Sequence, residues 1–203
     1  MTDVFIIGAG PAGLFAAKEI VENSDLSVKV IEEGKSISDR KCPSTETGEC
    51  KGCDPCDVMH GVGGTGGMSD GTLNLSPFIG GDLTDYVNIR EAEKLIETID
   101  STFQDFGASK KLYGGKKPKT EELERKAAAS DVKFIPIKQR HMGSENLPEI
   151  ISSFRKYLES KGVEFQINAK VDEITKNGVK IGDKEFNPKY VLAAPGRGGA
   201  VWL

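Results

Sequence analysis

The first 31 residues alternate between short apolar runs and a helical spacing of apolar positions. Val4–Ile7 and Val28–Ile31 are two short, mostly apolar runs, each of a length typical of a buried strand. Between them, residues 14–22 carry apolar side chains at the spacing of one helix face. Strand, helix and strand in this order predict one βαβ unit, whose parallel strands are joined by a right-handed crossover.

The rest of the chain predicts further helices and short strands. Residues 88–106 and 147–158 have the apolar periodicity of amphipathic helices. Residues 110–126, rich in lysine and glutamate, are predicted to be a mobile surface segment. Short apolar runs predict strands at residues 132–137, 163–167, 171–175, 178–181, 184–186 and 190–194. An Asn-Gly hairpin turn makes the strands between residues 171 and 186 a small antiparallel meander.

Composition and charge then narrow the function classes. The 203 residues carry a net charge of −4, so the balance of acidic and basic side chains does not favour a nucleic-acid partner. The most apolar stretch, residues 4–17, contains glycine and proline and is too short to span a bilayer. The N-terminus also lacks the pattern of a cleavable leader. We therefore expect a cytoplasmic protein without a membrane partner, and the oligomeric state stays open.

The 24 glycines gather in clusters, and the first cluster has the pattern of a dinucleotide-binding turn. G-x-G-x-x-G is met by Gly8, Ala9, Gly10, Pro11, Ala12 and Gly13. In such a motif Gly8 makes the turn, Gly10 lets a pyrophosphate approach, and Gly13 lets helix and strand pack closely. The helix that starts at Pro11 and Ala12 offers the phosphates its N-terminal partial charge. Glu32, followed by Glu33, stands where an acidic residue would bind ribose hydroxyls.

These motifs resemble a known class of flavoproteins. Residues 3–33 resemble the N-terminal FAD-binding segment of the glutathione-reductase-type flavoproteins. Residues 184–196 are similar to the strand and turn by which that superfamily returns to the nucleotide, with Pro195 at the usual threonine position between Ala194 and Gly196. The resemblance implies FAD as the cofactor, with the backbone of Val171 in contact with the adenine.

A narrower resemblance comes from three other segments. Residues 40–43, 61–71 and 140–144 are similar to the uncharacterised FAD-dependent dehydrogenases, an NAD(P)/FAD-dependent oxidoreductase family. The chain looks like the N-terminal part of such a protein, because it ends after a glycine turn where a helix is expected. The resemblance implies an FAD-dependent oxidoreductase acting on an unknown small-molecule substrate, with NAD(P) as a candidate electron donor or acceptor.

We therefore expect an α/β fold with three segments. A Rossmann-like FAD-binding domain, with a parallel sheet and a small β-meander, is formed by residues 1–87 and 148–203. A mostly helical cap insertion occupies residues 88–147. Two alternatives remain open: a non-catalytic nucleotide- or metal-binding fragment, and a flavin-linked disulfide reductase.

The second glycine cluster lies between residues 61 and 71 and is a candidate flavin contact. Ordering these glycines would cost conformational entropy, and the binding of a flat ligand would offset that cost. The alternative is that the stretch is a flexible linker. The candidate cofactor residues of this stretch are Gly63, Gly64, Gly66, Gly67, Met68, Ser69 and Asp70. Arg40 would neutralise the pyrophosphate or form a surface ion pair. His141 is a candidate proton donor, the alternative being a structural histidine.

All four cysteines fall in fifteen residues, which suggests a joint role. Cys42, Cys50, Cys53 and Cys56 have the spacing C-x7-C-x2-C-x2-C. Four thiolates at such spacing can hold an iron–sulfur cluster or a zinc ion. A redox-active dithiol beside the flavin is the competing interpretation, and inert thiols are the third.

Overall fold

The computed structural model describes residues 2–115 and 117–201 of the chain and divides them into two compact units. The first unit consists of residues up to 69 together with those from 151 onward, and the second consists of residues 70–150. The predicted insertion, residues 88–147, lies within the second unit, which also contains a strand at Thr72–Asn74 that pairs there.

A parallel four-stranded sheet forms the centre of the first unit, in the order β10-β1-β2-β6. Its strands are β1 (Val4–Ile7), β2 (Val28–Ile31), β6 (Glu164–Gln166) and β10 (Tyr190–Ala193). Ile7 pairs with both Ile31 and Ala193, so β1, β2 and β10 end at one level. This confirms the predicted α/β fold with its parallel sheet, and it brings the three following loops to one edge.

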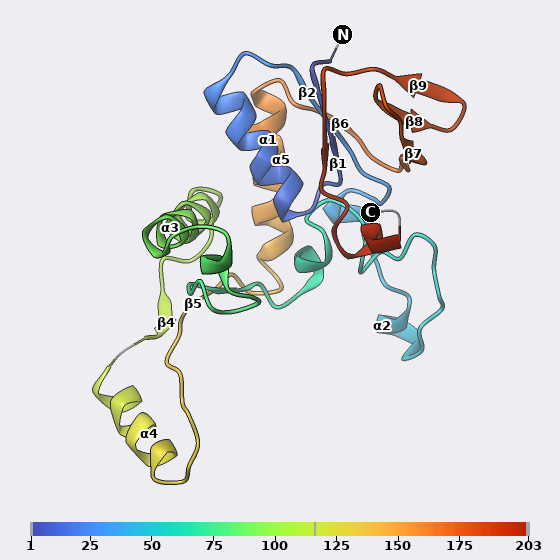
Figure 1. Cartoon of the computed structure of the whole chain (residues 1–203). Coiled ribbons are helices and arrows are strands. Elements are labelled where there is room, and N and C mark those ends of the chain that lie inside the picture. The colour runs from blue at the N-terminus through green and yellow to red at the C-terminus, as the bar shows by residue number, and fades with distance from the viewer. Residues whose placement is uncertain (1, 116, 202–203) are drawn as a thin grey trace. The chain divides into compact units, whose positions relative to one another are not determined.

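The two faces of this sheet are covered differently. Gly13 of helix α1 (Pro11–Asn23) packs on one face beside Ile6. Phe15 of α1 meets Phe154 of α5 (Leu147–Ser160) edge to face, with ring centroids 5.2 Å apart. On the other face lies the antiparallel meander, whose order is β7-β8-β9 (Figure 1). The meander strands are β7 (Glu173–Ile174), β8 (Val179–Ile181) and β9 (Lys184–Phe186).

The core between sheet and meander is apolar. It is formed by Phe5, Ile7, Ile31, Val171 and Val179. Successive side chains of β1 therefore point to opposite faces of the sheet, as expected for a strand buried on both sides. The predicted meander is confirmed, and its packing places the chain around Val171 close to the end of β1.

The second unit combines helices with a small antiparallel sheet, in the order β3-β5-β4. Its elements are β3 (Thr72–Asn74), α3 (Ile89–Asp105), β4 (Leu112–Gly114), α4 (Pro118–Ala128) and β5 (Lys138–His141). Asn88 caps α3 by accepting a hydrogen bond from the Glu91 amide at 3.1 Å. Arg140 of β5 is buried and pairs with Asp100 of α3, its Nη2 lying 2.7 Å from Asp100 Oδ2.

One sequence prediction in this unit is wrong. Residues 132–137 form no strand, and β5 begins only at Lys138. Val132 and Ile135 are 57% and 56% exposed, so the side chains of this apolar run do not form a buried strand face. Residues 110–126, expected to be a mobile surface segment, contain β4 and most of α4, neither of which has a buried residue. The mobility of the segment stays a prediction. Pro118 starts α4, and Thr120 Oγ1 accepts from the Lys117 amide at 2.7 Å.

Among the described residues, the first unit also contains four short helices. They are Ile37–Asp39, α2 (Ser44–Thr47), Thr65–Met68 and Gly196–Val201. Within residues 42–56, which hold the cysteines, α2 is the only helix or strand. Within the described part of the chain, no helix has the length and apolar character needed to cross a membrane.

Candidate functional site

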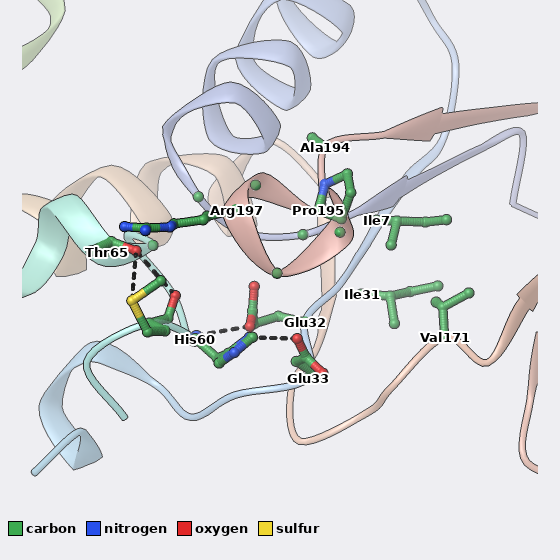
Figure 2. A pocket seen from close by; sticks show the side chains of 18 of the residues that line it. Ile7, Ile31, Glu32, Glu33, His60, Thr65, Val171, Ala194, Pro195 and Arg197 are labelled. Carbon is green, nitrogen blue, oxygen red and sulfur yellow. Dashed lines mark hydrogen bonds and ion pairs between the residues drawn. The ribbon is translucent and has the colours of Figure 1, made fainter. Parts of the chain in front are cut away.

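A pocket of about 260 Å³ opens at the edge where β1, β2 and β10 end. Every residue that lines it belongs to the first unit. The predicted cofactor residues among its lining are Gly8, Gly10, Pro11, Glu32, Glu33, Gly64, Gly66, Val171, Ala194, Pro195 and Gly196. Figure 2 shows Ile7, Ile31 and Val171 together at one side and polar side chains at the other. The pocket thus has an apolar end and a polar end.

The three glycines of the first turn serve different purposes. A Cβ at Gly8 would lie 2.3 Å from the carbonyl oxygen of Ala194, and Gly8 has a φ of +100°. A Cβ at Gly13 would lie 2.0 Å from the Gly8 oxygen. Both residues must therefore be glycine for the protein to pack. Gly10 is different, because a Cβ there would meet only the Gly64 Cα, at 3.8 Å. The open space beside Gly10 is part of the pocket.

Glu32 joins the first turn to the second glycine stretch. Its carboxylate is buried, the residue being 6% exposed. Oε2 accepts from the Ala9 amide at 2.7 Å, and Oε1 accepts from the amides of Gly34 and Gly61 at 2.9 and 2.8 Å. A carboxylate offers about four acceptor positions. Three are taken by the backbone, so Oε2 retains one acceptor position for a ligand.

The second glycine stretch packs directly against the first turn. The Gly63 amide donates to the Ala9 oxygen at 2.8 Å, and a Cβ at Gly64 would lie 3.1 Å from the Gly10 Cα. Gly63 and Gly67 allow close packing, because a Cβ at either position would lie within 3.0 Å of Ile151 Cδ1. The stretch is thus built into the fold instead of forming a flexible linker. Gly64 and Gly66 are its candidate cofactor residues that line the pocket.

Arg40 holds the loop between β2 and the second glycine stretch. The residue is 4% exposed, so it does not form the surface ion pair that we considered. Its guanidinium donates to four backbone oxygens at 2.8 to 3.0 Å, those of Asp57, Val58, Val62 and Gly64. Burial lowers the pKa of Arg40, and nearby acidic groups oppose this shift. Arg40 does not line the pocket, and its contact with a pyrophosphate stays a prediction.

Sequence reasoning missed several pocket residues. Those with longer side chains at the polar part of the lining or in its loops are Met59, His60, Thr65, Lys170 and Arg197; Ile7, Ile31, Gly61, Ala169, Gly198 and Gly199 were also not predicted. His60 Nδ1 lies 2.5 Å from Glu33 Oε1, as the dashed line in Figure 2 shows. A Cβ at Gly198 would lie 2.8 Å from His60 Cε1, so the imidazole packs against the turn that follows β10. The only available signal was that His60 directly precedes the second glycine cluster.

The remaining predicted residues lie outside the pocket lining. In the first unit these are Ala12, Gly13, Arg40, Gly63, Gly67, Met68 and Ser69. Asp70 and His141 belong to the second unit. Their contacts with a cofactor stay predictions.

The four cysteines lie in the turn-rich segment after Arg40. All are free thiols; Cys50 and Cys53 are exposed, and Cys42 and Cys56 are half-buried. Within residues 2–115 and 117–201, no group of three or more histidine, cysteine, aspartate or glutamate side chains is arranged to hold a metal ion. The predicted metal centre therefore has no support in the geometry.

Cys42 is expected to stay reactive to lower pH than an ordinary cysteine thiol does. Its Sγ lies 2.9 Å from Ser44 Oγ, and this hydrogen bond lowers the pKa of the thiol. Because the thiolate is the reacting form, a lowered pKa shifts the midpoint of a rate–pH profile downward. Labelling with a thiol reagent, followed by peptide mass analysis, measures the profile for each cysteine. Ser44→Ala should move the Cys42 midpoint upward, and an unchanged midpoint would contradict this explanation.

Comparisons with known proteins support the fold. No family model matches the chain, and no curated protein matches it. The structure is similar to glycine oxidase from Geobacillus kaustophilus, with a TM-score of 0.52 and 14% identity over 95% of this chain and 54% of that one. It is also similar to glycine oxidase from Bacillus cereus ATCC 14579, with a TM-score of 0.51 and 12% identity over 94% of this chain and 56% of that one.

The chain therefore spans about half the length of these two solved structures. At such low identity the likeness concerns the backbone arrangement. The chain has the mixed α/β fold of these oxidases, built around a parallel four-stranded sheet.

Proposed function

We propose that the chain is the FAD-binding part of an FAD-dependent oxidoreductase. The pocket at the level ends of β1, β2 and β10 carries this proposal. In open α/β sheets, ligands bind outside the carboxyl ends of the strands. Here that edge combines the N-terminus of α1, a buried acidic residue and two glycine stretches in one pocket.

The polar end of the pocket suits the phosphates of a dinucleotide. The first amides of a helix have no carbonyl partner within the helix, and at α1 these belong to Ala12 and Gly13. They would hold the pyrophosphate, with Gly10 leaving space for it. Lys170 and Arg197 add two cationic side chains to the lining. Together they would offset the phosphate charge.

The remaining lining suits the adenosine half. The free acceptor position on Glu32 Oε2 would bind one ribose hydroxyl, because the other three acceptor positions of the carboxylate are used by backbone amides. Ile7, Ile31 and Val171 provide an apolar wall for adenine. FAD would supply the acceptor for a hydride or an electron pair. The residues of the pocket bind and orient the adenosine half of that cofactor.

The choice of FAD over NAD rests on the second glycine stretch and on the flavoprotein resemblance of the sequence. The shared fold with two glycine oxidases agrees with an oxidoreductase. The substrate is proposed only as a small molecule, and NAD(P) as its electron partner is a further prediction. The cysteines supply no geometric argument for a second redox centre. Elemental analysis and acid-labile sulfide, measured on anaerobically prepared protein, test the predicted iron–sulfur cluster or zinc ion.

Competition binding tests this function directly. We expect FAD to bind more tightly than NAD, and ADP to displace FAD, because the pocket contacts belong to the ADP half. FMN lacks that half and should displace FAD poorly. Equilibrium titration by flavin fluorescence gives the dissociation constants. Tighter binding of NAD than of FAD, or displacement by FMN but not by ADP, would contradict the proposal.

A further inference from the structure

The small sheet of the second unit presents polar side chains on one face. Thr72 lies opposite His141 in the strand register, and Asn74 lies opposite Gln139. Because alternate residues of a strand share a face, these four side chains lie on the same side. Gln139 Nε2 donates to Asn74 Oδ1 at 2.7 Å. The ring of Tyr113 meets the His141 ring edge to face, with centroids 5.1 Å apart.

A hydrogen-bond chain runs through this face from Asp70 to His141. Asp70 Oδ1 accepts from the Thr72 amide at 3.1 Å, and Asp70 Oδ2 accepts from Thr72 Oγ1 at 2.8 Å. Thr72 Oγ1 lies 3.0 Å from His141 Nδ1. The hydrogen bond from the Thr72 hydroxyl lowers the pKa of Asp70, and the charge of His141 adds to this shift. Asp70 is therefore an ionised acceptor near neutral pH.

The direction of each hydrogen bond in this chain follows from the number of protons available. A threonine hydroxyl has one proton, and it is donated to the Asp70 carboxylate. The Thr72 oxygen must then accept a proton from His141, so a neutral His141 carries its hydrogen on Nδ1. The lone pair is left on Nε2. The residue His141 is exposed.

We propose that Asp70 and Thr72 are positioning residues that make His141 Nε2 a preformed proton acceptor for a small polar molecule. A proton would pass from an O–H or N–H group of that molecule to Nε2, leaving an imidazolium and the conjugate base. Two neighbouring groups are the Tyr113 ring, which contacts the His141 ring edge to face, and the Lys111 ammonium, which lies 4.7 Å from the Tyr113 ring centroid.

The use of this group in catalysis rests on the proposed function. Oxidation of an alcohol or amine by FAD transfers a hydride to the flavin and releases one proton from oxygen or nitrogen, which a base must accept. The hydrogen-bond arrangement itself requires no flavin. A failure of the tautomer experiment below can therefore be told apart from a failure of FAD binding.

Nitrogen-15 NMR of histidine-labelled protein tests the proposal. The chain has only two histidines, and His141→Gln assigns their signals. At a pH high enough for both imidazoles to be neutral, we expect His141 to carry its proton mainly on Nδ1. Unconstrained neutral histidine instead favours Nε2–H. Thr72→Val should shift the tautomer ratio of His141 toward Nε2–H by about tenfold, the loss of one net hydrogen bond.

Three further variants make the experiment decisive. Thr72→Ser keeps the hydroxyl and should retain the Nδ1–H form. Thr84→Val is a matched control, because Thr84 Oγ1 also donates to an aspartate two residues before it, Asp82, but no histidine follows in that hydrogen-bond chain. Asp70→Asn should weaken the preference without removing the hydroxyl. A wild-type His141 that is mainly Nε2–H, or a ratio that Thr72→Val leaves unchanged, would overturn the proposal.

Discussion

A valine at position 10 is expected to lower the affinity for FAD by about 100-fold or more while the protein still folds. In the proposed complex the pyrophosphate lies against Gly10 and accepts hydrogen bonds from the amides at the start of α1. Hydrogen bonds to charged groups contribute about 1.5–3 kcal/mol each. Loss of two such bonds corresponds to the stated factor, since ~1.4 kcal/mol is tenfold in affinity.

The fold should tolerate this substitution. Gly10 has an extended conformation, with φ of −72° and ψ of −178°, which any residue can adopt. Its Cβ would meet protein atoms only at 3.8 Å, so we expect the free energy of unfolding to change by no more than about 1 kcal/mol. Flavin fluorescence titration measures the affinity, and urea unfolding measures the stability.

A graded series separates binding from folding. Gly10→Ala adds one methyl group and should weaken FAD less than Gly10→Val does. Gly13→Ala is the contrasting variant, because its Cβ would lie 2.0 Å from the Gly8 oxygen. That variant should lose stability first and affinity only as a consequence. Full FAD affinity in Gly10→Val would show that the pyrophosphate does not approach this turn.

Replacement of Arg40 by alanine is expected to have the largest effect on stability. The four backbone oxygens that accept from its guanidinium would lose their partner in a buried region. A buried acceptor left without its hydrogen-bond partner costs about 1–3 kcal/mol, so four such acceptors are expected to destabilise the protein by several kcal/mol. We expect a loss of this size in urea unfolding, together with a loss of FAD binding, because Gly64 belongs to the pocket lining.

Lysine should not replace Arg40. A single ammonium cannot reproduce the planar fork that reaches four acceptors at once, so Arg40→Lys should be destabilised almost as strongly as Arg40→Ala. The exposed Arg90 of α3 provides the control. Arg90→Ala should change the free energy of unfolding by less than about 0.5 kcal/mol. Equal effects at positions 40 and 90 would show that the buried hydrogen bonds contribute nothing.

The βαβ unit was predictable because its signals are local. The apolar runs of β1 and β2 match the observed strands residue by residue. The glycine turn between β1 and α1 involves residues close in the chain, and the spacing of its glycines reports the packing of that turn. The position of Glu32 in the pocket lining also follows from the βαβ order, since parallel strands end at one edge.

The failed prediction depended on partners far away in the sequence. Residues 132–137 have the apolar character of a strand but form none, whereas the polar residues of β5 pair with both β3 and β4. Local apolarity cannot reveal whether such partners exist.

The sequence by itself determined the fold class, the turn that faces the pocket and the acidic residue at the end of β2. Only the tertiary structure decided what these residues do. Glu32 bonds to Gly61, 29 positions away, and Arg40 bonds to Gly64, 24 positions away. His60 lies in the pocket because the loop that Arg40 holds in place brings its imidazole to the Glu33 carboxylate. Such assignments depend on how distant backbone groups satisfy their hydrogen bonds, and residue spacing contains no record of those pairings.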